Sequence, residues 1–562
     1  MRLFPLGDSA VVVALGNGVD EALQQRTQAF VAELGRNPPI GVTDVVPTFA
    51  SLTIFYDAAR IGGFDQLCAQ IETCAARTEA ALVLPAARIV EIPVCYGGDF
   101  GPDLAEVAAH AGLTVAEVIA LHSGALYHVD AVGFAPGFGY LGGLPKKIHT
   151  PRRATPRTQV PAGAVGIGGA QTGIYPLATP GGWNLIGRTR LRLFDGTREE
   201  PALMRVGDGV SFRAISSAEF DAAANAVSQS LLDVNERRSP SAGEAEGTLL
   251  NGDGTAGVMV VRAGMQTTVQ DLGRRGHRAA GVPLSGAMDP FALRVANLLV
   301  GNAENAAVLE FAVVGPEIEF SAETVVAVGG GDFGALPRWQ PVRMAPGERV
   351  NFGATHSGCR GYLAIAGGFA VAPVLGSRST YLSAALGGVD GRVLRDGDVL
   401  RSPRLTRQVV GRWHIDERIL PAYSAAPTVR IMRGAQADEF GDALCAGEFK
   451  VSPRSDRMGV RLEVAALVRS ARGDLVSSAV APGTIQVPPD GQPIILMADA
   501  QTIGGYPQAA HVIDVDLPLV AQLRPGDAVR FREVALAEAH GLAHDRELAL
   551  ARLREGLTGK VR

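Results

Sequence analysis

Three arginines that follow a glycine-rich stretch are well suited, by type and spacing, to hold an anion. The segment GFAPGFGYLGG (133–143) lets backbone N–H groups approach a ligand, because glycine has no Cβ. Arg152, Arg153 and Arg157 follow it, with Pro156 between the last two. Guanidinium groups bind carboxylate or phosphate through two parallel hydrogen bonds. The pattern predicts a substrate site with these arginines; the alternative is that the glycines shape turns and the arginines are solvated.

Two residues before this stretch could transfer protons. His122 and Tyr127 carry groups that donate or accept a proton in enzyme sites, and we interpret both as catalytic. The alternative is a structural histidine, because HSG (122–124) is typical of a helix end.

A glutamine and a tyrosine recur in the two halves of the chain. Gln171 and Tyr175 are echoed by Gln501 and Tyr506. Amide and phenol groups can hydrogen-bond an amide such as a lactam, so we expect these four residues to bind substrate. Packing within a barrel is the competing interpretation.

Acidic and arginine side chains form two polar clusters in the second half, Gln270–Asp271–Arg274 and Arg454–Asp456–Arg457, and Asp499 stands before Gln501. Buried acid–arginine pairs are often purely structural. We expect at least one of the acids to face a ligand. The pattern leaves open which acid this is; we assign Asp499 as catalytic and Arg454 and Arg457 as substrate-binding.

Composition excludes several classes of protein. Hydrophobic residues at 47% and charged residues at 19% are typical of a globular protein, and a net charge of -5 gives no reason to expect nucleic acid. The start, MRLFPLGDSAVVVALG, lacks the features of a secretory signal, and no apolar stretch is long enough to cross a membrane. Five scattered cysteines predict packed thiols and no metal site. We expect a cytoplasmic protein.

Lysines are rare and lie outside nucleotide or biotin motifs. Only Lys146, Lys147, Lys450 and Lys560 occur. None stands in a Gly-Lys-Ser/Thr loop, and none is flanked by Met as a biotin-bearing lysine would be. The sequence thus predicts no P-loop and no biotin attached to this chain.

The chain divides into units by its pattern of strands, helices and turns. Residues 1–85 have the pattern of an α+β unit with strand, helix, strands and helix, which predicts a ferredoxin-like domain. A mainly β organisation follows, and the predicted units are a barrel at 86–215, a linker at 216–255, a barrel at 256–402, a barrel at 425–536 and a C-terminal helix at 537–562. The linker is polar and rich in Ser, Gly and Glu, as a gene fusion would leave.

An internal repeat supports related barrels. PAGAVGIGGAQTGIYP (161–176) resembles APGTIQVPPDGQPIILMADAQTIGGYP (481–507), with an insertion in the second copy. Each copy is followed by a Gly-Asp turn and a strand, VGDGVSF (206–212) and RPGDAVRF (524–531). Similar segments in the same order predict similar folded units.

Longer motifs carry a resemblance to known families. HSGALYHVDAVGFAPGFGYLGG and its continuation (122–189) resemble the B subunit of 5-oxoprolinase, with Ala164 where that family usually has Ser. Segments 264–311, 376–398, 452–463 and 496–517 resemble, in order, the 5-oxoprolinase C subunit, which is classed with biotin-dependent carboxyltransferase-like proteins. The resemblance implies cyclophilin-like β-barrels and a fusion of B and C.

The resemblance also implies a function. Such proteins, with a separate A subunit, open 5-oxoproline to L-glutamate at the expense of ATP, which we expect to act together with Mg. Two alternatives share the family: carboxyl transfer from carboxybiotin to urea or another amide, and non-enzymatic binding to a histidine kinase. Expected partners are the 5-oxoprolinase A subunit, the small substrate and, optionally, further copies of the chain, with no nucleic acid and no membrane.

Overall fold

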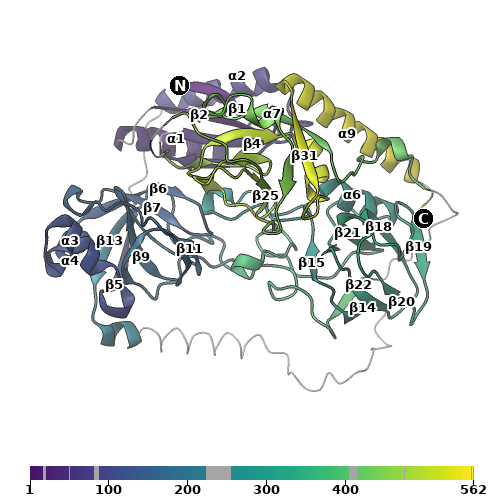
Figure 1. Cartoon of the computed structure of the whole chain (residues 1–562), viewed down its shortest axis with the longest axis horizontal. Coiled ribbons are helices and arrows are strands. Elements are labelled where there is room, and N and C mark those ends of the chain that lie inside the picture. Colours follow the sequence, from purple (N-terminus) through teal and green to yellow (C-terminus); the bar gives the residue numbers. More distant parts are fainter. Residues whose placement is uncertain are drawn as a thin grey trace.

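A computed structural model describes residues 1–562 apart from 17–20, 50, 81–87, 223–254, 404–413, 472, 474, 559, 561 and 562. Most of the predicted linker, 216–255, therefore lies outside the described residues. Four units are visible in Figure 1: an α+β layer, a barrel at lower left, a two-sheet unit at lower right and a second barrel in the upper centre.

The N-terminal unit places two helices against one four-stranded antiparallel sheet of order β1-β2-β4-β3. Its core joins Phe30 and Ile71 of the helices to Val11 and Ile54 of the sheet. The element order is strand, strand, helix, strand, strand, helix, whereas a ferredoxin-like domain begins with a single strand. Residues 2–14 form a hairpin because Gly7, at φ 62°, turns the chain back. The elements are β1 (Arg2–Leu6), β2 (Ala10–Ala14), α1 (Glu21–Arg36), β3 (Val42–Thr48), β4 (Ser51–Tyr56) and α2 (Phe64–Ala80).

The first barrel is closed by seven strands in the order β10-β7-β6-β13-β5-β12-β9. Two short helices, α3 (Leu104–Ala111) and α4 (Val115–Ser123), pack on it, and Thr114 caps α4 in a capping box with Glu117. A small separate sheet pairs β8 (Arg157–Val160) with β11 (Thr179–Gly181). The barrel strands are β5 (Ile89–Tyr96), β6 (Leu126–Val132), β7 (Gly139–Gly142), β9 (Ala164–Gly168), β10 (Gln171–Ile174), β12 (Asn184–Arg188) and β13 (Gly209–Ala214).

The third unit is a pair of facing sheets, which corrects the barrel predicted for 256–402. One sheet has the order β20-β17-β14-β22 and the other β15-β16-β21-β18-β19. Side chains such as Val260 and Phe320 from one sheet meet Phe311 and Leu363 from the other in a shared core. A shared apolar core stabilises two open sheets without a hydrogen-bonded seam, so strand periodicity alone could not distinguish this packing from a barrel.

The elements of this unit are β14 (Thr255–Arg262), β15 (Gln266–Gln270), α6 (Pro290–Leu299), β16 (Val308–Ala312), β17 (Glu317–Phe320), β18 (Thr324–Asp332), β19 (Pro341–Met344), β20 (Arg349–Asn351), β21 (Ser357–Ile365) and β22 (Val399–Pro403). Helix α6 lies against β18 and β21 with nearly all of its side chains buried.

The second barrel repeats the topology of the first. Its order is β23-β30-β27-β28-β25-β24-β31, again with seven strands and one small separate sheet, β26-β29. Its elements are β23 (Thr428–Arg433), α7 (Ala443–Ala446), β24 (Phe449–Val451), β25 (Gly459–Glu463), β26 (Ser478–Ala479), β27 (Thr484–Gln486), β28 (Ile494–Leu496), β29 (Ile503–Gly504), β30 (Gln508–Val512), α8 (Leu517–Ala521) and β31 (Ala528–Glu533).

The strands of the two barrels correspond one to one. In each barrel the first strand pairs in parallel with the last, β5 with β13 and β23 with β31, while the other barrel pairings are antiparallel. Gly163 and Gly483 open equivalent strands with φ of 81° and 91°. In each case a Cβ would lie within 2.6 Å of a backbone oxygen, so both copies require glycine. The repeat predicted from the sequence is confirmed at the level of strand order.

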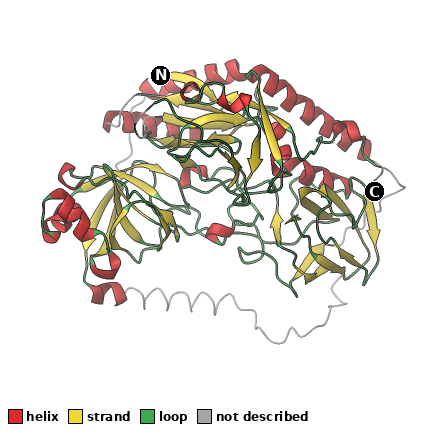
Figure 2. Ribbon diagram, in the orientation of Figure 1, coloured by secondary structure: helices red, strands yellow, loops and turns green. Residues whose placement is uncertain are grey.

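The last helix, α9 (Leu536–Leu557), connects distant parts of the molecule. His540 near its start packs on Tyr56 and Phe64 of the N-terminal unit, and Glu547 binds Arg294 of α6. Figure 2 shows α9 as the long helix that runs along the upper edge. No single described helix is long and apolar enough to cross a membrane; only α3 with α4, bent by 95°, passes that test as a pair.

Candidate functional site

The N-terminal unit and both barrels meet in one apolar core. Phe49 and Phe55, from the end of β3 and from β4, share it with Phe138 and Trp183 of the first barrel and with Ile503 of the second. The contact is close, because a Cβ on Gly133 would lie 2.6 Å from the Ile503 side chain. Segments from both halves of the sequence therefore pack as one body here.

A segment of the two-sheet unit, residues 271–289, runs between the barrels; we call it the junction segment. Gly137 in the turn before β7 donates its N–H to Ala280 O at 2.9 Å. Arg457, in the equivalent turn before β25, donates to Gly286 O at 2.5 Å. The junction segment thus lies between equivalent turns of the two barrels.

The N-terminal unit also holds the junction segment. The Asp44 carboxylate of β3 accepts the N–H groups of Gly276 at 2.9 Å and Arg278 at 3.2 Å. The Arg278 guanidinium stands 4.1 Å from the centre of the Phe55 ring. Burial raises the pKa of Asp44, although the neighbouring Arg278 charge opposes this shift.

A buried ion-pair group lies where the junction segment meets the second barrel. Arg457 donates from Nε and Nη2 to the Asp499 carboxylate at 2.9 and 3.1 Å, and from Nη1 to Glu310. All three side chains are buried. Burial opposes the charge on Arg457, but Asp499 and Glu310 outweigh it and raise the pKa of Arg457. The structure therefore brings together two of the predicted residues, Arg457 and Asp499, and adds Glu310.

Asp271 and Arg274 organise the adjoining loop. Asp271 accepts hydrogen bonds from the hydroxyls of Ser377 and Ser379, each at 2.6 Å. Arg274 is fully buried and donates from Nε to Val374 O at 3.2 Å and from Nη2 to Ser379 O. Burial lowers the pKa of Arg274, and the Asp271 and Asp499 charges oppose this shift; burial, and then the Asp499 charge, raise the pKa of Tyr381.

Two atoms in this region are buried polar groups without hydrogen-bond partners among the described residues, Arg274 Nη1 and Ser285 Oγ. Ser285 donates its N–H to Ala498 O at 2.8 Å, next to Asp499, and has a φ of 54°. We use the name polar hub for Asp271, Arg274, Ser285, Glu310, Tyr381, Arg457 and Asp499. Ser285 and Tyr381 were not predicted from the sequence, because hydroxyl groups within Gly- and Ala-rich loops carry no spacing signal.

A second polar group lies on the first barrel. Tyr140 and Tyr175 are buried, and burial raises the pKa of each to about 12. The charge of Arg152, which is exposed, acts on both hydroxyls, and Ser477 before β26 hydrogen-bonds Tyr140. Tyr140, Tyr175 and Arg152 form what we call the tyrosine cluster, at the boundary with the second barrel.

The other two predicted arginines are held by an acid of the barrel itself. Arg153 Nη1 and Arg157 Nη2 donate to Asp103 Oδ1 at 2.9 and 2.7 Å, and Leu185 N–H donates to the other oxygen at 2.7 Å. Asp103 therefore ties the loop to β12, and its side chain makes no capping hydrogen bond on α3. These contacts give Arg153 and Arg157 a structural role.

His122 and Tyr127 lie in the barrel core, which argues against the predicted catalytic role. His122 is fully buried, with its two ring nitrogens 2.8 Å from Tyr96 Oη and 3.0 Å from Thr172 Oγ1. Tyr127 donates its hydroxyl to His122 O at 2.8 Å. Burial lowers the pKa of His122 to about 3, so its ring is neutral.

The paired glutamines and tyrosines are not structurally equivalent. Gln171 begins β10, whose counterpart is β28, whereas Gln501 and Tyr506 follow β28 on either side of β29. Gln501 lies 3.4 Å from Gln486 Oε1, and Tyr506 is exposed, as is Arg454. The residue echo is therefore coincidental within a real structural repeat.

No group of three or more His, Cys, Asp or Glu side chains that could hold a metal ion occurs in the described part of the chain.

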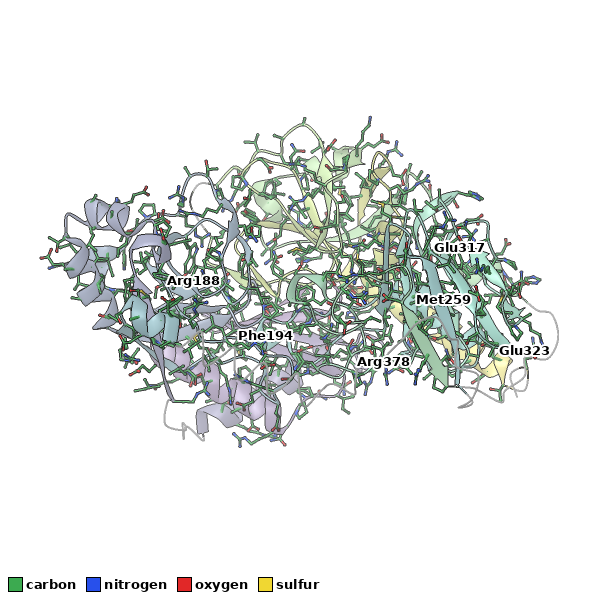
Figure 3. The ribbon with its side chains drawn as sticks, turned by 90° about the horizontal axis from the view of Figure 1, so that it is seen from below. Arg188, Phe194, Met259, Glu317, Glu323 and Arg378 are labelled. Atoms are coloured by element: carbon green, nitrogen blue, oxygen red, sulfur yellow. The ribbon has the colours of Figure 1, made fainter. Side chains whose placement is uncertain are left out.

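Figure 3 shows the molecule from below. Arg188 and Phe194 lie on the side of the first barrel, and Arg378 lies toward the two-sheet unit, which carries Met259 and Glu317.

Residues 1–204 match the family model of subdomains C and D of a carboxyltransferase domain, and residues 280–533 match that of its subdomains A and B. The N-terminal unit, the two barrels and the two-sheet unit together therefore correspond to such a domain. The chain belongs to the family of the 5-oxoprolinase B and C subunits and carries both parts in one polypeptide.

Individual relatives agree with this assignment. The 5-oxoprolinase B subunit of Bacillus subtilis is 43% identical over 226 residues, 39% of this chain and 94% of the relative. The C subunit of Escherichia coli K12 is 38% identical over 299 residues, 51% of this chain and 94% of the relative. Urea amidolyase of Saccharomyces cerevisiae is 31% identical over 326 residues, 53% of this chain but 18% of that protein. The crystal structure of TTHA0988 superposes with a TM-score of 0.78 at 35% identity, over 93% of this chain and 99% of that one.

Proposed function

We propose that the chain is the B–C component of an ATP-dependent 5-oxoprolinase, which activates 5-oxoproline for hydrolysis to L-glutamate with a separate A subunit. The observation that carries this proposal is the match to the B and C subunits over 94% of each relative's length. The packing of the two halves around the junction segment supports it, because residues from both parts then act in one site.

The chemistry follows from the stability of an amide. Lactam hydrolysis is slow because attack at the carbonyl carbon breaks amide resonance. Transfer of the γ-phosphoryl group from ATP to the lactam oxygen forms an O–P bond and releases ADP. Water then adds to the activated carbon, the ring C–N bond breaks as the nitrogen takes a proton, and a second water hydrolyses the resulting acyl phosphate to the glutamate carboxylate and inorganic phosphate. We assign activation to this chain and ring opening to the A subunit.

Phosphate groups would be held by Arg152 in the tyrosine cluster, which is exposed and whose charge acts on the Tyr140 and Tyr175 hydroxyls. Mg²⁺ would arrive bound to the nucleotide. We further propose that no biotin is attached to this chain and that its barrels are cyclophilin-like. We also propose that the protein acts in the cytoplasm.

The test is phosphate release by the full chain mixed with the A subunit. We expect release only when ATP and 5-oxoproline are both present. Arg152→Ala should slow it roughly ten- to a hundredfold, because one charge-assisted contact contributes about 1.5–3 kcal/mol. Arg205→Ala, which removes an exposed partner of Glu200, is the matched control and should leave release unchanged. Release that ignores 5-oxoproline would refute the proposal.

A second candidate function is carboxyl transfer from carboxybiotin to urea or another amide. It is favoured by the carboxyltransferase family models and by the match to urea amidolyase. Product formation from urea, bicarbonate and a biotinylated carrier, with no response to 5-oxoproline, would establish it in place of the first.

A further inference from the structure

A cavity of about 290 Å³ lies against the C-terminal end of α9. None of its lining residues belongs to the polar hub or to the tyrosine cluster. Its volume lies near the lower limit for small-molecule sites, which enclose about 300–1,000 Å³. Figure 1 shows this end of α9 at the right, near the C-terminus. One face of the helix, with residues three and four positions apart, forms the first wall: Ala549, Arg552, Leu553, Gly556, Leu557 and Lys560.

The opposite wall is formed by residues 414–419, on the connection between the two-sheet unit and the second barrel. Ile415 anchors this wall, because it is buried and donates its N–H to Trp339 O at 3.3 Å. Ile415 and Leu557 belong to one apolar core, and Ile419 and Leu553 pack against it. The floor of the cavity is therefore apolar and is built from both walls.

Gly556 keeps this space open. It lies inside α9 and lines the cavity, yet a Cβ at this position would meet no atom within 4 Å. Glycine is a poor helix former, so the helix would gain stability from a larger residue here. A side chain at position 556 would therefore take up room that is open to a ligand.

The rim of the cavity favours a negative charge. Arg552 and Lys560 contribute two cations, and Arg552 is exposed and forms no ion pair within the described residues. The acid of the lining, Asp416, is already held by Arg418, whose Nε lies 3.0 Å from each carboxylate oxygen. A guanidinium binds a carboxylate through two parallel hydrogen bonds. An apolar floor below a cationic rim thus fits a ligand with a hydrocarbon body and an anionic end.

We propose that this cavity binds a small aliphatic carboxylate, with its chain over Ile419, Leu553 and Leu557 and its carboxylate on Arg552. The charge of the rim selects the anion, and the volume of the cavity limits the length of the chain. The bound ligand joins α9 to the connection between the two-sheet unit and the second barrel. This site goes beyond the proposed function, since it requires neither ATP nor the A subunit.

Calorimetric titration of the full chain with straight-chain carboxylates, from acetate to octanoate, tests the site. Each added CH₂ should tighten binding about three- to fourfold until the cavity is full, because burying a CH₂ contributes about 0.8 kcal/mol. 1-Hexanol has the chain of hexanoate without the charge and should bind about tenfold more weakly. Arg552→Gln should weaken hexanoate binding by a similar factor and leave 1-hexanol binding unchanged.

Gly556→Leu fills the cavity and should weaken hexanoate binding at least tenfold. Its melting temperature should stay the same or rise, because leucine is a better helix former than glycine. Gly541→Leu is the matched control: Gly541 also lies inside α9 with no atom within 4 Å of a Cβ, but it does not line the cavity. This control should bind hexanoate like the unmodified chain.

Three results would overturn the proposal. Unchanged hexanoate binding in Gly556→Leu would place the ligand outside the cavity. Affinity that does not rise with chain length would mean that the carboxylate meets only a solvated arginine. Equal binding of 1-hexanol and hexanoate would mean that the rim does not select an anion.

Discussion

At the scale of single residues, burial decides which titratable groups are available. His122 and His511 are both buried, and burial lowers their pKa values to about 3 and about 4. Each keeps hydrogen-bonded ring nitrogens, to Thr172 and to Thr484. Neutral imidazoles of this kind shape barrel cores, and their protonation opposes folding.

We predict that stability falls as the pH drops below about 6.5. His122 has an ordinary pKa of 6.5 in the unfolded chain and about 3 when folded, so its contribution is complete above pH 6.5 and lost as pH falls toward 3. At pH 5.5 the unfolding free energy should be lower by about 1.4 kcal/mol through His122. Urea unfolding of the His122→Gln variant at pH 7.5 and 5.5 should show a correspondingly smaller pH effect.

His110→Gln, at an exposed position on α3, is the control and should retain the full pH effect. An unchanged pH effect in His122→Gln would show that His122 does not titrate with unfolding.

At the scale of elements, part of the architecture can be predicted from the sequence and part cannot. The Gly-Asp turns and the glycine at 163 and 483 predict the repeat, because only glycine fits where a strand passes close to another backbone. The repeated Gln and Tyr residues do not mark equivalent positions. Gln171 begins β10, whereas Gln501 and Tyr506 lie on either side of β29, after the counterpart of β10. The pairing of Arg457 with Asp499 and Glu310 depends on contacts 42 and 147 residues apart along the chain, which no local pattern encodes.

The Asp44 contact gives a prediction for the junction segment. Asp44→Ala removes the acceptor of two backbone N–H groups, and a hydrogen bond to a charged group contributes about 1.5–3 kcal/mol. Amide hydrogens of residues 276–281 should therefore exchange roughly ten- to a hundredfold faster, as measured by mass spectrometry. Glu319→Gln, which removes the partner of half-exposed Arg349, should leave their exchange unchanged. Unchanged exchange in Asp44→Ala would mean that the barrels alone hold the segment.

At the scale of the whole molecule, many contacts join the B-like and C-like halves. Asp8 accepts the N–H of Asp514 on both carboxylate oxygens at 3.1 Å, and Tyr56 Oη lies 3.2 Å from His540 Nε2. Together with Asp44 and the shared apolar core, they predict that the halves remain associated after the chain is cut between residues 223 and 254. A protease site inserted there and gel filtration after cleavage test this; separation of the halves would contradict it.

The strength of that association should depend on Asp8. Burial and the neighbouring Asp514 charge raise its pKa well above the ordinary value of 3.8. A raised pKa in the assembled state means that association is strongest when Asp8 is protonated and weakens as pH rises through that pKa. Asp516, Tyr56 and His540 also face Asp8, so the pH dependence is compared between chains with and without the Asp8 carboxylate.

Replacing Asp8 separates the effect of its charge from that of its hydrogen bonds. Asp8→Asn keeps an acceptor oxygen and removes the charge. We therefore expect the cleaved variant to bind several-fold more tightly than the cleaved unmodified chain at pH 9 and to lose the pH dependence in calorimetry. Asp65→Asn, on the exposed face of α2, should behave like the unmodified chain. Weaker association in Asp8→Asn would show that the negative charge of Asp8 holds the halves together.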